Sequence, residues 1–340
     1  MPLDLVLLAA AATLPPRTAA PTPSMPVSTF SIVARDKTTG ELGVAVQSHW
    51  FSVGSVVPWA EAGVGAVATQ SFVEPSYGPL GLERMKKGVP ADQALKELLA
   101  KDPHPDVRQV AFVDAQGRAA AHTGEHCIPG AGHHVGDSYT TEANLMLTGE
   151  VPDAMAAAFE AAKGPLAERM LAALDAAQAV GGDIRGKQSA ALLVVRAKPS
   201  DKPWTDRLVD LRIEDNPEPL KEMRRLLNLH RAYEKMNRGD DATAEGKMDV
   251  ALAEYGGAQT MVPDNDEFVF WTAVALVSNA RETEALGLFA KAFRMNPSWM
   301  LLVPRLQRVG QLPATPGLVE KILAVGPESS LKAAARTGTP

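Results

Sequence analysis

Apolar positions recur at two different periods along this chain, and the change of period divides the sequence. From residue 29 to about residue 214, short apolar runs typical of strands alternate with amphipathic segments typical of helices. From residue 217 onward the strand pattern stops and the helical spacing continues alone. We therefore expect a mixed α and β domain at 29–214 and an all-α domain at 217–340, preceded by a leader and Pro-rich linker at 1–28.

The first domain reads as strands, two helices, strands, two helices and strands. The predicted strands are 29–34, 42–48, 54–60 and 63–72, a hairpin at 107–123, and then 189–197 and 207–213. The predicted helices are 77–87, 90–101, 152–162 and 164–180. Because the first four strands are mostly apolar on both faces, both faces should be covered. This order predicts an α+β fold of stacked antiparallel sheets with helices outside, rather than alternating β-α-β units.

The second domain contains an internal echo at a spacing of 34 residues. The residues that recur are Ala251, Tyr255, Ala258 and Pro263, followed by Ala285, Phe289, Ala292 and Pro297. Small and aromatic residues at helix-packing positions, with a proline after the second helix, are typical of tetratricopeptide repeats at this period. The alternative is two unrelated helical hairpins. We interpret 237–247 as an insertion between the helices of the first repeat.

Composition excludes several classes of function. The formal net charge is −6 with 22% charged residues, and no basic stripe offers a source of nucleic-acid affinity. A single cysteine, Cys127, allows no intrachain disulfide. No apolar run reaches the roughly 20 residues of an integral membrane segment. We expect no cofactor and no nucleic-acid partner.

The N-terminal residues leave localisation open. Residues 5–14 have the length of a signal-peptide apolar region, and a small-residue cleavage site follows at Ala20. The first four residues carry no positive charge, however, which a signal peptide normally has. We expect a secreted or periplasmic protein, with the cytoplasm as the alternative if translation begins at Met25.

Thr29 begins a strand directly after this leader, and that position suits a nucleophile. A threonine hydroxyl is a weak nucleophile unless a base lies beside it. At the start of a chain the threonine's own α-amine, with a pKa near ~8, provides that base. The alternative is a β-branched residue that simply begins a strand.

Three stretches of the sequence support the assignment of Thr29 as a nucleophile. They are the segment from TFSIVARDKTTGELGVAVQSHW to SYGPLGL (29–82), then AAHTG (120–124), and GGDIRGKQSAALLVV (181–195). They resemble the bacterial and archaeal family known as domain of unknown function 1028, which is similar to the N-terminal-nucleophile hydrolases. The resemblance implies a four-layer αββα sandwich over about residues 29–213, with Thr29 as the candidate nucleophile. It implies no particular substrate.

One strand also looks like part of a proteasome-type subunit, with an important departure. The segment GVAVQS (43–48) is similar to the second strand of such subunits, in which an acidic residue helps to fix the active site. Gln47 stands at that position here. The next strand carries Thr69 and Gln70 where those subunits have a lysine. The proteasome mechanism therefore cannot be transferred whole.

Further candidates lie at the ends of strands. Asp183 and Arg185 precede a strand, where Arg185 could hold a substrate carboxylate or amide through its forked guanidinium. They could equally cap a helix and bridge a loop. Ser48 and Gln70 end apolar strands and are candidates for oxyanion stabilisation or orientation, or ordinary strand ends.

A histidine-rich stretch raises the possibility of metal binding. The residues are His122, His126, Cys127, His133 and His134. Their spacing fits no standard zinc finger, and glycine-rich loops also collect histidines without a metal. We assign no metal ligand, and a zinc protein remains a third alternative.

Together these observations predict a hydrolase of an amide-like bond with an N-terminal threonine nucleophile. Its substrate would be an unidentified small molecule or peptide. Neither cleavage after Ala20 nor a start at Met25 exposes Thr29, so the hypothesis requires autolysis between Ser28 and Thr29 or a separate protease. The rival is a non-catalytic scaffold whose helical repeats bind a protein partner.

Overall fold

The computed structural model describes residues 27–327, so the predicted signal sequence and cleavage site lie outside the described residues. Their strands form two antiparallel sheets. The six-stranded sheet has the order β10-β9-β2-β1-β8-β7, and the four-stranded sheet has the order β3-β4-β5-β6. The bounds are β1 (Thr29–Arg35), β2 (Leu42–Ser48), β3 (Pro58–Glu61), β4 (Gly65–Ser71), β5 (Arg108–Asp114), β6 (Ala119–Thr123), β7 (Gly132–Gly136), β8 (Tyr139–Ala143), β9 (Ser189–Val195) and β10 (Arg207–Ile213).

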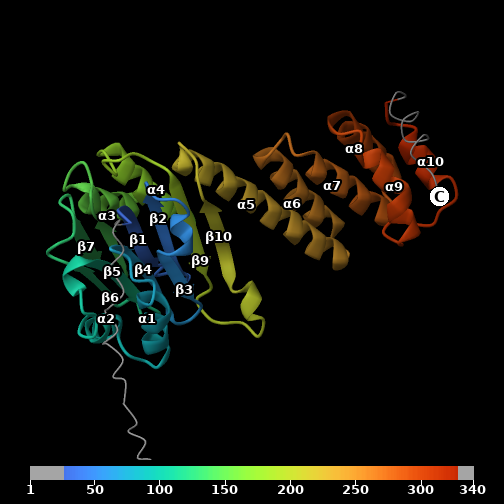
Figure 1. Cartoon of the computed structure of the whole chain (residues 1–340). Coiled ribbons are helices and arrows are strands. Elements are labelled where there is room, and N and C mark those ends of the chain that lie inside the picture. Colours follow the sequence, from blue (N-terminus) through green and yellow to red (C-terminus); the bar gives the residue numbers. More distant parts are fainter. Residues whose placement is uncertain (1–26, 328–340) are drawn as a thin grey trace, which may run out of the picture.

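Helices cover the outer face of each sheet (Figure 1). α3 (Val151–Ala161) and α4 (Leu166–Ala179) pack on the six-stranded sheet. α1 (Tyr77–Lys86) and α2 (Ala91–Leu99) pack on the four-stranded sheet. The inner faces of the two sheets meet in a third apolar cluster. The layers therefore follow the order helices, sheet, sheet, helices.

The alternation of residues in β1 determines which side chains face each layer. Phe30 and Ile32 join the cluster under α3 and α4, whereas Val33 joins the cluster between the sheets. Thr29 lies on the same face of the strand as Val33. Antiparallel pairing with β2 sets Thr29 opposite Ser48, so both lie at one end of the six-stranded sheet.

The second part of the chain is helical, as its periodicity predicts (Figure 1). Its helices are α5 (Pro219–Ala244), α6 (Met248–Met261), α7 (Asp266–Ser278), α8 (Glu282–Met295), α9 (Trp299–Arg308) and α10 (Leu318–Leu323). The small and aromatic residues of the 34-residue echo are buried in α6 and α8. Pro263 and Pro297 follow the ends of those two helices.

The helix α5 belongs to both parts of the molecule. Met223 and Leu227, in its first half, are buried in the cluster that α3 and α4 form on the six-stranded sheet. Met236 and Ala242, in its second half, are buried against α6. Residues after the expected boundary at 214–217 thus complete the core of the sandwich.

Three sequence expectations were wrong or incomplete. The strands β7 and β8 were not predicted from the sequence, because β7 is glycine-rich and partly exposed while β8 is buried but polar. Val53–Ser55 forms a 3-10 turn, so the strand expected at 54–60 begins only at Pro58. Most of the supposed insertion at 237–247 continues α5, since packing against α6 supports a helix through residues of low helical propensity.

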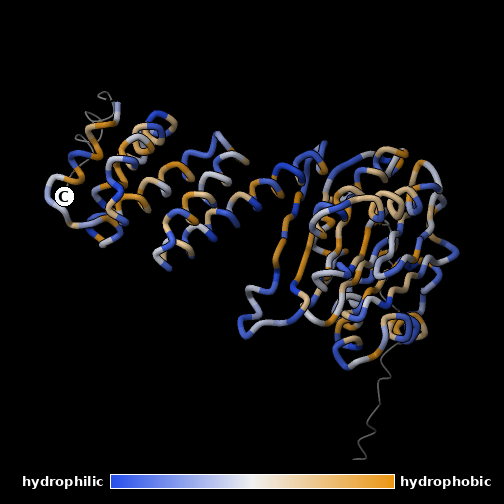
Figure 2. Tube along the Cα trace, turned by 180° about the vertical axis from the view of Figure 1, so that it is seen from behind, coloured by the Kyte–Doolittle hydropathy of each residue, from blue (hydrophilic) through white to orange (hydrophobic). Residues whose placement is uncertain are grey.

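Hydrophobic stretches follow the strands of the sandwich, whereas the helices beyond it alternate hydrophobic and hydrophilic turns (Figure 2). This pattern matches sheets covered on both faces. Among the helices, α7 is the exception to the alternation, because it is apolar and buried around most of its circumference. Among residues 27–327, the helices are too short or too polar to span a bilayer.

Candidate active site

Thr29 is completely buried at the start of β1. Its hydroxyl donates to the carbonyl oxygen of Val27 at 2.8 Å and lies 3.2 Å from Oγ of Ser48. Position in the strand explains this contact, because Thr29 and Ser48 are paired across β1 and β2. The candidate nucleophile is therefore held by polar groups on both sides.

The carbonyl oxygen of Ser28, which precedes Thr29, accepts two hydrogen bonds. Oγ of Ser48 donates to it at 2.5 Å, and Nη2 of Arg185 donates to it at 2.9 Å. Two donors converging on one carbonyl oxygen, one of them cationic, can stabilise negative charge that develops there. Ser48 also neighbours the hydroxyl of Thr29. One serine thus links the candidate nucleophile to the carbonyl beside it.

Asp183 fixes the guanidinium of Arg185. Nε and Nη2 of Arg185 donate to the two carboxylate oxygens at 3.0 and 2.8 Å, and the backbone N–H of Arg185 donates at 2.9 Å. The backbone N–H of His49 donates to the same carboxylate at 3.1 Å. The side chain of Asp183 is fully buried, so this forked pair has little freedom to move.

Gln70 contacts the other side of Thr29. Its Nε2 donates to the carbonyl oxygen of Thr29 at 3.4 Å and to Oε1 of Gln109 at 2.8 Å. Its Oε1 accepts from the hydroxyl of Ser31 at 2.8 Å. Gln70 therefore orients the backbone of Thr29, whereas Ser48 and Arg185 hold the preceding carbonyl. All five candidate residues from the sequence lie together.

Glu142 is a buried carboxyl group that sequence reasoning missed. It lies opposite Ser31 in the pairing of β1 with β8, and its Oε1 lies 3.3 Å from Oγ of Ser31. Complete burial raises the pKa of Glu142 well above its usual range. Within the part of the chain that the structure describes, its Oε2 has no hydrogen-bond partner. Glu142 thus lies in β8, opposite the residue two positions along β1 from Thr29, and its raised pKa favours the protonated form.

Gln47 lies outside this cluster. Its side chain points to the helix layer, where Nε2 donates to Oε1 of Gln178 in α4 at 2.9 Å. The alternation of β2 explains the placement, because neighbouring residues of a strand face opposite sides. Gln47 therefore plays no part in holding Thr29.

The histidine-rich stretch is divided among separate partners. His126 pairs with Asp106 and His134 with Asp153, while His133 contacts Thr123. The part of the chain that the structure describes holds no group of three or more histidine, cysteine or acidic residues able to bind a metal ion. Cys127 is buried, and burial raises the pKa of its thiol, which makes it a poor nucleophile.

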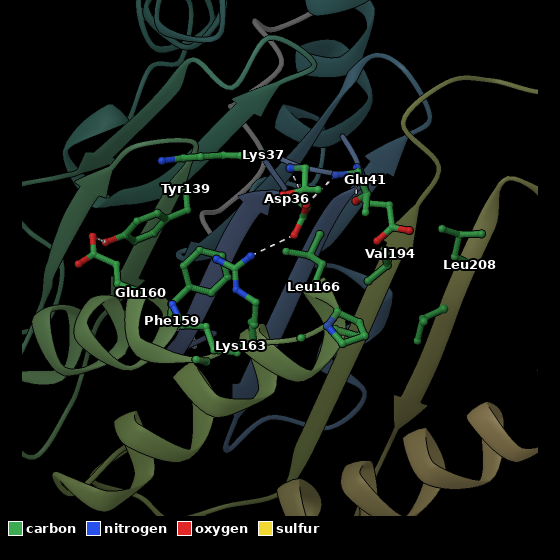
Figure 3. Close-up of a pocket in the computed structure, with 18 of the residues that line it drawn as sticks. Asp36, Lys37, Glu41, Tyr139, Phe159, Glu160, Lys163, Leu166, Val194 and Leu208 are labelled. Carbon is green, nitrogen blue, oxygen red and sulfur yellow. Dashed lines mark hydrogen bonds and ion pairs between the residues drawn. The ribbon is translucent and has the colours of Figure 1, made fainter. Parts of the chain in front are cut away.

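A groove of about 940 Å³ lies at the opposite end of β1 (Figure 3). The rise of an extended strand places Asp36, which lines the groove, about 20 Å along β1 from Thr29. In it Arg169 donates to Asp36 at 3.0 Å, and its guanidinium lies 4.3 Å from the ring centre of Phe159. These charges are already paired, and no sequence-predicted site residue lines the groove. The cluster around Thr29 remains the stronger candidate.

Comparison with known proteins gives a family but no activity. The model of a family of unknown function, DUF1028, matches residues 29–223. The crystal structure of protein SPO2555 from Silicibacter pomeroyi, described with the same family model, is similar at a TM-score of 0.53 and 31% sequence identity. That similarity covers 59% of this chain and 84% of the Silicibacter chain. No curated protein matches the sequence.

Proposed function

The chain belongs to the DUF1028 family, and from that premise we propose that it hydrolyses an amide bond with Thr29 as an N-terminal nucleophile. The observation that carries the proposal is the pair of hydrogen bonds from Ser48 and Arg185 to the Ser28 carbonyl, next to the Thr29 hydroxyl. The order of layers agrees with the αββα sandwich of N-terminal-nucleophile hydrolases.

The first step of the proposed mechanism is maturation. Oγ1 of Thr29 attacks the carbonyl carbon of Ser28, and Ser48 and Arg185 hold the resulting oxyanion. The C–N bond breaks, the nitrogen of Thr29 takes the hydroxyl proton, and an ester joins Ser28 to Thr29. Water then hydrolyses the ester, which releases Ser28 as a carboxylic acid and leaves Thr29 with a free amine and hydroxyl.

The mature site would then act on a second molecule. The α-amine of Thr29 accepts the Oγ1 proton while Oγ1 attacks the substrate carbonyl, whose oxygen takes the place of the Ser28 oxygen. The amine product leaves with that proton. Water releases the acyl group as a carboxylic acid and restores Thr29. Asp183 keeps the Arg185 guanidinium aimed at the oxyanion throughout.

Burial favours cleavage by the chain itself over a separate protease. Val27, Ser28 and Thr29 are each at most 1% exposed. A protease needs an accessible, extended segment, and this bond would reach one only after local unfolding. We propose that residues 1–28 leave by autolysis, whether or not residues 1–20 act as a signal for export.

Intact-mass measurement of the purified full chain tests the proposal. We expect a product that begins at Thr29, at a rate independent of protein concentration because the reaction is intramolecular. Thr29→Val keeps the β-branched shape without the hydroxyl and should stop cleavage, whereas Thr29→Ser should retain it. Loss of one oxyanion donor in Ser48→Ala should slow cleavage by about 10²-fold or more. Cleavage of Thr29→Val at the same bond would refute the nucleophile assignment.

We also propose that α5–α8 form two tetratricopeptide-like repeats that bind a protein partner. Burial of the echoed residues in α6 and α8 supports this assignment. Such repeats present concave surfaces to peptides. If intact-mass measurement finds no cleavage, recruitment of a partner by this region becomes the leading function.

A further inference from the structure

We infer that the substrate is peptide-like on its acyl side, with a small residue at the scissile carbonyl and a β-branched apolar residue before it. This inference rests on the proposed function. Its basis is the way in which Val27 and Ser28 already occupy the space beside Thr29. In a maturing chain these two residues are the first acyl group that the site handles, and a later substrate would take the same place.

Val27 binds through its backbone to the end of β4. Its N–H donates to the carbonyl oxygen of Ser71 at 2.7 Å, and the N–H of Ser71 donates to the carbonyl oxygen of Val27 at 3.0 Å. This reciprocal pair is an antiparallel bridge, the contact by which an extended peptide adds to a strand. Ser71 has a positive φ of 66°, so the strand ends here and its polar groups turn to Val27.

The side chain of Val27 selects an apolar residue. It is 1% exposed and belongs to the apolar cluster between the two sheets, together with Val53 and Val57. A charged or strongly polar side chain at this position would lose its hydration without a partner. A short branched side chain fits without displacing the core. The cluster thus gives the site a preference at the second residue before the cleaved bond.

The surroundings of Ser28 leave room only for a small side chain at this position. Ser28 is fully buried, and its Oγ has no hydrogen-bond partner among residues 27–327, so within them the hydroxyl contributes no specific recognition. Alanine should therefore serve as well as serine. After cleavage, the new carboxylate of Ser28 would face the Arg185 guanidinium and the Ser48 hydroxyl. The released leader end should bind as a product.

The first test follows cleavage within the full chain. Val27→Ile should be cleaved within about twofold of the natural rate, whereas Val27→Asp should be slowed by about tenfold or more. Thermal unfolding of the Thr29→Val background, with and without the Val27 changes, shows whether the fold survives. Equal cleavage of the Ile and Asp variants would overturn the inference.

The second test does not depend on how the variants fold. The self-processed protein is given acetyl-Pro-Val-Ser and acetyl-Pro-Asp-Ser, each joined by an amide to a fluorogenic amine. We expect kcat/KM to favour the valine peptide by about tenfold or more, and acetyl-Pro-Val-Ala to match it. The free acid Met-Pro-Val-Ser should inhibit competitively, unlike Met-Pro-Asp-Ser.

The outcomes separate the two proposals. Cleavage of both peptides at equal rates would remove the inference and leave the proposed function standing. Turnover of a non-peptide amide together with inertness of both peptides would do the same. If the full chain shows no processing and no amide is hydrolysed, the proposed function fails and the inference fails with it.

Discussion

At the scale of single residues, a network of buried polar side chains between the sheets fixes the surroundings of Thr29. Ser31, Gln70 and Gln109 form a continuous set of hydrogen bonds behind the candidate nucleophile. Glu142 lies at the end of this set, beside Ser31, and burial raises its pKa well above the usual range. A buried network of this kind holds its members in one arrangement, because each polar group that loses its partner destabilises the fold.

The raised pKa of Glu142 makes stability depend on pH in a defined direction. Above the ordinary glutamate pKa, the unfolded chain releases this proton while the folded chain keeps it. Stability therefore falls with rising pH, by at most about 1.4 kcal/mol per pH unit, until the folded pKa is reached. Glu142→Gln keeps the shape and cannot titrate. We expect the free energy of unfolding of this variant, relative to that of the natural protein, to increase steadily from about pH 5 upward.

Urea unfolding at several pH values measures this gain. Glu125→Gln, at an exposed loop residue, is the matched control. Parallel stability curves for Glu142→Gln and the natural protein would show that Glu142 is not a buried neutral acid.

Sequence reasoning reached some residues of the site and not others, for a physical reason. Thr29 and Ser48 lie at the ends of strands whose apolar pattern is plain in the sequence, and Arg185 lies in the turn that precedes the equally apolar strand β9. Glu142 belongs to a strand whose composition is polar, although every residue of it is buried. Burial there comes from the neighbouring sheet, which local sequence does not encode.

At the scale of elements, one close approach holds α5 and α6 together. A Cβ added at Gly239 in α5 would lie 2.3 Å from the ring of Tyr255 in α6. Tyr255 is buried, and its hydroxyl donates to Asp240 at 2.8 Å. The absence of a side chain at Gly239 thus sets the distance between the two helices.

Two alanine substitutions test this contact. Gly256→Ala in α6 has nothing within 4 Å of the added carbon, so its helical propensity should stabilise the protein by about 0.5–1 kcal/mol. Gly239→Ala gains the same propensity but forces the helices apart, and should destabilise by about 1–3 kcal/mol. Thermal and urea unfolding of both variants measure the difference. Equal stabilisation by both would show that the helices pack differently.

Periodicity predicted most elements of both parts, but not where α5 ends. The apolar spacing after residue 217 is regular, and the echo at 34 residues predicted which residues of α6 and α8 are buried. The end of α5 was placed too early because Gly239 and Asp240 favour turns in isolation. Contact with Tyr255 overrides that preference, and a contact between distant residues is not visible in a local pattern.

At the scale of the whole molecule, α5 makes the helical region part of the sandwich core. We expect a chain that ends after Asp215 to lose the apolar cover supplied by Met223 and Leu227, at about 1.5–3 kcal/mol for each buried side chain. A chain that ends after Glu234 keeps this cover. The shorter chain should unfold about 10 °C or more below the longer one, as measured by circular dichroism. Coincident transitions would mean that the sandwich is complete without α5.

The continuity of α5 also governs how the two parts can move. Its 26 residues span about 39 Å as one helix, with proline only at its first position. A change of angle between the two parts would have to break hydrogen bonds along the helix axis, since no flexible linker separates them. A partner bound to the distal helices would therefore keep a fixed orientation relative to the sheets. A force applied to that partner would be transmitted along α5 to the six-stranded sheet.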